Sequence, residues 1–156
     1  MRTRRLSTQH GVAAIEFAIV FTVLFVALYG IATFGAVLYT QQVVSRAAEE
    51  GARAAPMRPR LALPSDQAEA IAEIRHLVHQ AMADSLVVPA GNAATPTTRL
   101  AWVSANVTVS VVTAIPSVTV TVSYPYGAFP MLPSLPLLAP WLPVHLTSRA
   151  VASIHS

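Results

Sequence analysis

Residues 11–38 read GVAAIEFAIVFTVLFVALYGIATFGAVL, and the organisation of the whole chain follows from them. After the leading glycine, 27 residues carry a single charged group, the Glu16 carboxylate. A helix rises about 1.5 Å per residue, so this run is longer than the roughly 30 Å hydrocarbon core of a bilayer. The stretch therefore predicts a transmembrane helix over residues 12–38.

Glu16 has two interpretations. It lies about 6 Å inside the start of the helix, where a carboxylate can still reach the lipid headgroups and is less costly than at the bilayer centre. Alternatively, cleavage after Gly11 would create an α-ammonium group on Val12, one helical turn before Glu16. In a low-dielectric medium each charge needs a partner. Pairing of the two groups, within one chain or between neighbouring chains, would neutralise both and set the register of a subunit.

The charges on the two sides of the predicted span differ. Three arginines precede it, whereas a balanced set follows it, namely Arg46, Glu49, Glu50 and Arg53. By the positive-inside rule, the N-terminus is cytoplasmic and the remainder is exported. The apolar region is about twice as long as that of a secretory signal, which argues against a freely secreted product.

Composition excludes several functional classes. The formal charge of +3 comes from ten arginines and seven acids, but three arginines lie before Gly11, so a product cleaved there would have 10 − 3 = 7 arginines against seven acids. Nucleic-acid binding then has no electrostatic basis. The chain has no cysteine, hence no disulfide and no thiolate metal site. No catalytic motif is recognisable, so we expect neither an enzyme nor a cofactor.

Beyond the membrane, helical spacing continues through residues 39–55, until Pro56 and Pro59 should end the helix. One helix would then both span the bilayer and form the spine of an exported domain, residues 56–156. A second helix is predicted at about 66–85, with Asp66 and Glu69 as a capping box. Its buried stripe comprises Ile71, Ile74, Val78 and Met82. On its other face, we take Glu73, His76 and His79 to be solvent-exposed rather than metal ligands.

Alternating apolar and polar residues predict strands at about 102–112, 117–124 and 144–154, after a loop at 89–98. Trp102 is expected to cover the apolar face of the sheet. The fold class is therefore α+β, with a transmembrane helix extended as a long spine, a second amphipathic helix and a small antiparallel sheet of about three strands.

The connection between the last two strands, residues 125–143, contains six of the twelve prolines among large apolar side chains. Proline cannot join a strand ladder, so this segment is not a strand. It could fold back as a lid over one end of the sheet. Alternatively, it could be an exposed apolar loop that docks another subunit or an assembly protein.

Several segments resemble the TadE-like family, whose members are pilin-like proteins of tight-adherence (Tad) pilus systems. They are GVAAIEF at 11–17, the apolar helix, SRAAEEGAR at 45–53 and VTVTVSYP at 118–125. The resemblance implies a bacterial inner-membrane protein with a cytoplasmic leader at 1–11. A prepilin peptidase would cut it between Gly11 and Val12, and Glu16, followed by Phe17, would be the charge partner during assembly.

Two functional hypotheses follow. In the first, the chain is a minor pilin or pseudopilin that takes part in Tad pilus assembly. Its partners would be the peptidase, other pilins, Tad inner-membrane assembly proteins and membrane lipid, and the finished pilus is a further location. In the second, it is an uncleaved single-pass protein whose exported domain, periplasmic or otherwise extracytoplasmic, recruits or scaffolds partner proteins.

Overall fold

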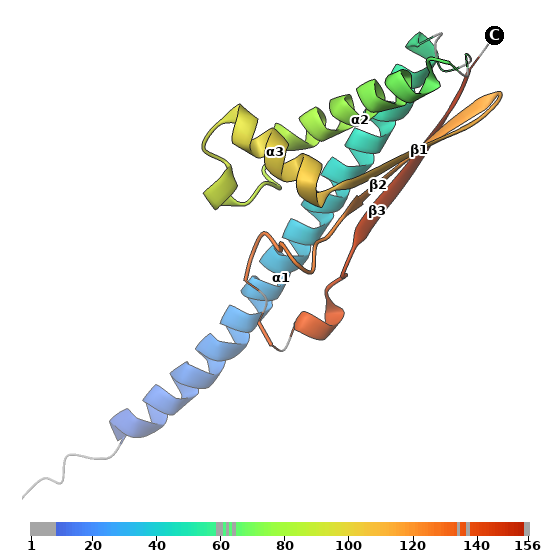
Figure 1. Cartoon of the computed structure of the whole chain (residues 1–156). Coiled ribbons are helices and arrows are strands. Elements are labelled where there is room, and N and C mark those ends of the chain that lie inside the picture. Colours follow the sequence, from blue (N-terminus) through green and yellow to red (C-terminus); the bar gives the residue numbers. More distant parts are fainter. Residues whose placement is uncertain are drawn as a thin grey trace, which may run out of the picture. The chain divides into compact units, whose positions relative to one another are not determined.

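The computed structural model describes residues 9–58, 61, 63, 65–133, 135–136 and 138–154, and its fold is α+β as predicted (Figure 1). The helices are α1 (Gln9–Ala54), α2 (Gln67–Ala83) and α3 (Pro96–Asn106), with short 3₁₀ helices η1 (Ala55–Met57), η3 (Ala90–Asn92) and η4 (Ala139–Trp141). The strands are β1 (Thr108–Ala114), β2 (Ser117–Tyr124) and β3 (Leu146–Ser153). Two units are distinguished, Met1–Gly35 and Ala36–Ser156, and the division falls within α1.

The first unit contains most of the predicted span. From Gly11 to Phe25 every side-chain position on α1 is exposed, as expected of a helix that is surrounded by lipid rather than by its own domain. Residues 1–8, most of the predicted leader, lie outside the described residues. The predicted end of the long helix is confirmed, because α1 stops at Ala54 and Pro56 lies in η1.

In the second unit, the last turns of α1 form one side of the core. The buried positions are small or medium-sized, namely Val44, Ala47, Ala48, Ala52 and Ala55. Figure 1 shows α2 running alongside this part of α1. A Cβ atom on Gly51 would lie 2.7 Å from Val78 Cγ2 of α2 and 3.0 Å from Val120 Cγ1 of β2. Gly51 therefore lets α1 approach a helix and a strand at once.

The sheet is antiparallel in the order β1-β2-β3. The predicted strand at 117–124 is confirmed at both ends, and the predicted last strand begins two residues late, at Leu146. On β2 the three valines at 118, 120 and 122 are fully buried and alternate with half-buried Ser and Thr. This matches the period of two on which the prediction depended. Val144, the first residue of the predicted strand, lies outside β3 and is 68% exposed.

The prediction of a strand from residue 102 is wrong, because α3 occupies residues 96–106 and β1 begins at Thr108. Thr95 has the extended backbone typical of an N-cap, and its side chain and that of Thr98 form a reciprocal capping box, with Pro96 at the first helical position. The predicted loop therefore ends at Thr95. Trp102 is buried on α3, with its ring centroid 5.0 Å from that of Phe129.

The predicted helix at 66–85 is confirmed as α2, with Ile74, Val78 and Met82 buried on its stripe. The predicted capping box is wrong. Asp66 is the N-cap residue, but its φ of −112° and ψ of 0° are not those of an extended N-cap, and its side chain makes no capping hydrogen bond.

The proline-rich segment combines features of both alternatives. Tyr126 is buried, and Phe129 packs against the core, as a lid would. The Tyr124 hydroxyl, which lies 3.0 Å from both the Val87 and the Phe129 carbonyl oxygens, links the start of the segment to the connection after α2. Trp141, by contrast, is 75% exposed.

Candidate functional site

The predicted cleavage residues lie in the first turns of α1, which begins at Gln9. Both Gly11 and Val12 are exposed, and a Cβ atom on Gly11 would have no neighbour within 4 Å. Packing within the chain therefore does not require a glycine at position 11, in contrast to Gly51. The first four N–H groups of a helix have no intrahelical acceptor, so opening this turn to a protease sacrifices few hydrogen bonds.

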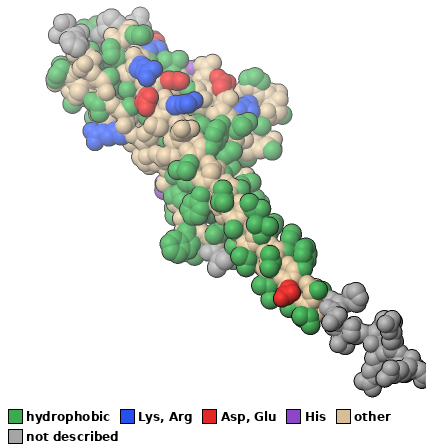
Figure 2. All heavy atoms as spheres, turned by 180° about the vertical axis from the view of Figure 1, so that it is seen from behind, with side chains coloured by type: hydrophobic (Ala, Val, Ile, Leu, Met, Phe, Trp, Pro, Cys, Tyr) green, Lys and Arg blue, Asp and Glu red, His purple; other side chains and the backbone are tan. Residues whose placement is uncertain are grey.

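Glu16 is exposed on α1, five positions after Gly11, in the position that the sequence predicted. Its carboxylate has no hydrogen bond or ion pair with any described side chain. The next charged residue along the helix is Arg46. Figure 2 shows that the surface of this part of the helix is largely apolar. In a membrane, such a carboxylate is costly unless another group pairs with it.

An aromatic ridge follows Glu16 and was not part of the sequence interpretation. It comprises Phe17, Phe21, Phe25 and Tyr29, whose successive ring centroids are 5.8, 6.3 and 5.9 Å apart. Residues four apart lie on the same face of a helix, so the spacing alone would have indicated this ridge. Rows of this spacing pack into the grooves of a neighbouring helix. The ridge brings Phe17 into a surface suited to helix–helix contact.

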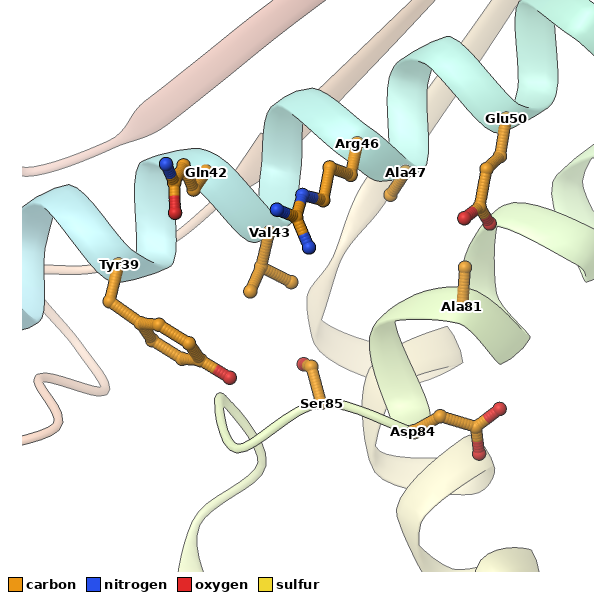
Figure 3. Close-up of a pocket in the computed structure, with 9 residues that line it drawn as sticks. All are labelled: Tyr39, Gln42, Val43, Arg46, Ala47, Glu50, Ala81, Asp84 and Ser85. Carbon is orange, nitrogen blue, oxygen red and sulfur yellow. The ribbon is translucent and has the colours of Figure 1, made fainter.

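A groove of about 240 Å³ lies in the second unit between α1 and the end of α2 (Figure 3). The Arg46 side chain points into it from α1, while Glu50 and Asp84 line it from α1 and from the residue after α2. Arg46 makes no ion pair with any described residue, although Glu50 follows it by four positions. The other pair at this spacing is formed, with 3.7 Å between Arg53 Nη2 and Glu49 Oε2.

The interpretation that His79 faces solvent is wrong. Its ring is half-buried, and Nε2 lies 3.3 Å from the Val107 carbonyl oxygen, which follows α3. Burial lowers the pKa of His79, and the nearby charges of His76 and Arg75 act in the same direction. Glu73, at the other end of this motif, pairs with Arg58, with 2.6 Å between Oε2 and Nε. The motif thus holds α2 to its neighbours, and no group of three metal-ligating side chains occurs in the described part of the chain.

Acid is expected to destabilise the second unit through His79. A His pKa below the unfolded value of about 6.5 means that the unfolded chain binds the proton more tightly. The stabilising contribution is complete above pH 6.5 and is lost as the pH falls through the lowered pKa of His79. We expect His79→Gln to flatten the decline in melting temperature below pH 6.5. His76→Gln, a change at an exposed position one turn earlier, should leave the decline intact.

Comparison with known proteins identifies the long helix. Residues 11–53 match the model of the TadE-like protein family, so the match begins at Gly11 and includes Glu16 and all of α1 except Gln9, His10 and Ala54. Searches of curated proteins and of solved structures each found no similar chain. α1 is long and apolar enough to cross a membrane. The match and this helix support a membrane protein related to the Tad pilus, whose N-terminal helix is similar to that of TadE-like proteins.

Proposed function

We propose that the chain is a minor pilin or pseudopilin of the bacterial inner membrane, cleaved after Gly11 by a prepilin peptidase, which takes part in Tad pilus assembly. The observation that carries the proposal is the family match, which begins at the residue before the proposed cut. The N-terminus is cytoplasmic and residues 39–156 are exported. The role is structural rather than catalytic.

The chemistry of the proposal concerns the charge on Glu16. Cleavage releases an α-ammonium group on Val12, four residues before the carboxylate and therefore on the same side of the helix. The exposed carboxylate is available for it, because no described side chain pairs with Glu16. In lipid or in a helical bundle, the two charges stabilise each other within one chain or between neighbours. The aromatic ridge supplies the apolar contact through which a neighbouring helix packs.

One observation favours the alternative, an uncleaved single-pass protein whose exported domain recruits or scaffolds partners. The Gly11–Val12 bond lies inside α1, so a peptidase must first open the start of this helix. The two functions make different predictions about the mass of the protein in its host.

The test is the intact mass and N-terminal sequence of the protein from cells with and without the prepilin peptidase. We expect a chain starting at Val12 in peptidase-positive cells only. A chain starting at Met1 in both strains contradicts the proposal and leaves the scaffold alternative.

A matched pair of variants locates the cut. At both Gly11 and Gly30, no atom lies within 4 Å of the position that a Cβ atom would take, so a leucine at either site meets no clash at its Cβ atom. We expect Gly11→Leu to remain uncut and Gly30→Leu to be processed normally.

A further inference from the structure

The proline-rich segment leaves the sheet at the end of the second unit that lies nearest Gln41. Gln41 Nε2 donates to the Thr147 carbonyl oxygen over 3.2 Å, which places the start of β3 beside this part of α1. The other end of β3 contacts η1, which follows the end of α1. Gly127 and Val144 are joined by a 2.8 Å backbone hydrogen bond just beyond the last β2–β3 pair. The start of β3 therefore lies beside Gln41, three residues beyond the predicted end of the span at Leu38.

Large apolar side chains are exposed at the same end. Trp141 is 75% exposed and Val144 is 68% exposed, both shortly before β3. Leu86, from the connection after α2, is 70% exposed, and its backbone N–H donates to the Tyr39 hydroxyl over 3.3 Å. Leu86 thus lies beside Tyr39, while Trp141 and Val144 belong to the connection that leads into β3 at Gln41.

Charge is absent from the segment. No Asp, Glu, Lys or Arg occurs between Arg99 and Arg149. Among charged side chains of the other elements, Arg99 lines a pocket with Leu86 and donates to the Ala83 and Ser85 carbonyl oxygens, while Arg46 and Asp84 line the groove between α1 and α2. Within the second unit, Figure 2 shows charged side chains gathered toward one end. An exposed apolar surface without charges marks a contact site rather than a surface bathed in water.

We propose that this surface, formed by Trp141, Val144 and Leu86, rests in the lipid headgroup region of the outer leaflet. The argument is continuity with the spanning helix, because the headgroup region extends about 5–7 Å beyond each side of the hydrocarbon core, the depth at which residues just after Leu38 lie. Tryptophan is enriched at this interface, where its ring meets both lipid and water. The proposal requires that α1 spans a membrane but does not require cleavage at Gly11.

Proline composition fits the same environment. Backbone N–H groups that lose water without gaining a hydrogen bond are costly near lipid. Six of the residues in 125–143 are prolines and have no N–H to desolvate. An irregular segment can therefore approach the interface at a smaller cost than one of ordinary composition.

Tryptophan fluorescence tests the proposal on the uncleaved full chain in phosphatidylcholine vesicles with and without brominated acyl chains. The chain has two tryptophans, and Trp102 is only 8% exposed. The difference between the wild type and Trp141→Phe isolates the emission of Trp141. We expect brominated lipid to quench this emission and aqueous iodide to leave it largely unchanged, while Trp102 responds to neither.

Two outcomes overturn the proposal. Quenching by iodide but not by brominated lipid would place Trp141 in water. Protection from both quenchers would place Trp141 against protein, and a second copy of the chain is then the first candidate. Neither outcome bears on cleavage, because the leader is present throughout.

A matched pair of substitutions gives a second measurement. Val144 and Val151 are both exposed, at 68% and 59%, so aspartate at either position leaves the described core intact. We expect Val144→Asp to lift the segment from the interface and restore Trp141 emission in brominated vesicles. Val151 lies further along β3, away from Gln41, so Val151→Asp should leave the quenching unchanged. Equal quenching in both variants contradicts the proposal.

Discussion

Gly51→Val is expected to destabilise the second unit by about 3 kcal/mol or more, the upper end of the range for overpacking a well-filled core. The added Cβ atom would lie 2.7 Å from Val78 Cγ2, closer than Cβ atoms approach other atoms in proteins, and 3.0 Å from Val120 Cγ1, which is also a tight contact. Both neighbouring side chains are fully buried and β-branched, so neither can rotate aside easily. Because the free energy of unfolding of a typical domain is about 5–15 kcal/mol, the variant loses a large part of its stability.

The measurement is thermal unfolding of the full chain in detergent, followed by near-ultraviolet circular dichroism of the tertiary structure. Gly35→Val is the control, because it makes the same change in the same helix where nothing lies within 4 Å of the new Cβ. An unchanged melting temperature in Gly51→Val would show that α1, α2 and β2 do not meet as closely as described. The melting temperature of Gly51→Ala should fall between those of Gly51→Val and Gly35→Val, since a gain of about 1 kcal/mol in helix propensity opposes the clash of the added Cβ atom.

The parts of the fold that the sequence predicts are those with a local period. The strand at 117–124 was predicted to the residue, because valine alternates with Ser and Thr for its whole length. α1 was predicted because its apolar run is long and two prolines follow it. In each case the pattern alone is sufficient, since nothing distant in sequence has to be known.

The missed helix α3 shows where local patterns compete. The alternating valines of β1 predict a strand that reaches back to Trp102, although Trp102 and Val103 are buried on a helix. Thr95 and Pro96 carry the signal that could have identified its start. At α2 the sequence predicts a capping box that the structure lacks, because Asp66 has a suitable side chain but not the extended backbone that capping requires. A cap depends on the path of the preceding chain, which a sequence motif does not specify.

The candidate site divides in the same way. The positions of Gly11, Val12, Glu16 and Phe17 on one exposed helix follow from the sequence, and the aromatic ridge could have been read from its spacing of four. The close approach at Gly51 and the burial of His79 could not be predicted from the sequence, since both depend on which elements pack together. The role of the cleavage residues and of Glu16 stays a prediction.

Loss of pili is the expected result of Glu16→Gln in the native host, with cleavage after Gly11 retained. The amide keeps the shape of the side chain but removes the charge that would pair with the α-ammonium group on Val12. Breaking a buried ion pair by removing one partner costs about 3–5 kcal/mol, which corresponds to a roughly 100- to 4,000-fold weaker association. Pili are counted by electron microscopy, and the mass of the protein from the same cells reports processing.

Glu49→Gln is the matched control for this loss, because it removes an acid from the same helix where the side chain is exposed and pairs with Arg53 at 3.7 Å. Exposed pairs contribute only about 0–1 kcal/mol, so piliation should persist. Normal piliation in Glu16→Gln would remove the charge pair from the mechanism while leaving cleavage to be judged by mass alone. Loss of pili in both variants would instead assign the effect to the acidity of the helix as a whole. A loss confined to position 16 therefore identifies the beginning of α1 as the place where a cleaved subunit recognises its neighbour.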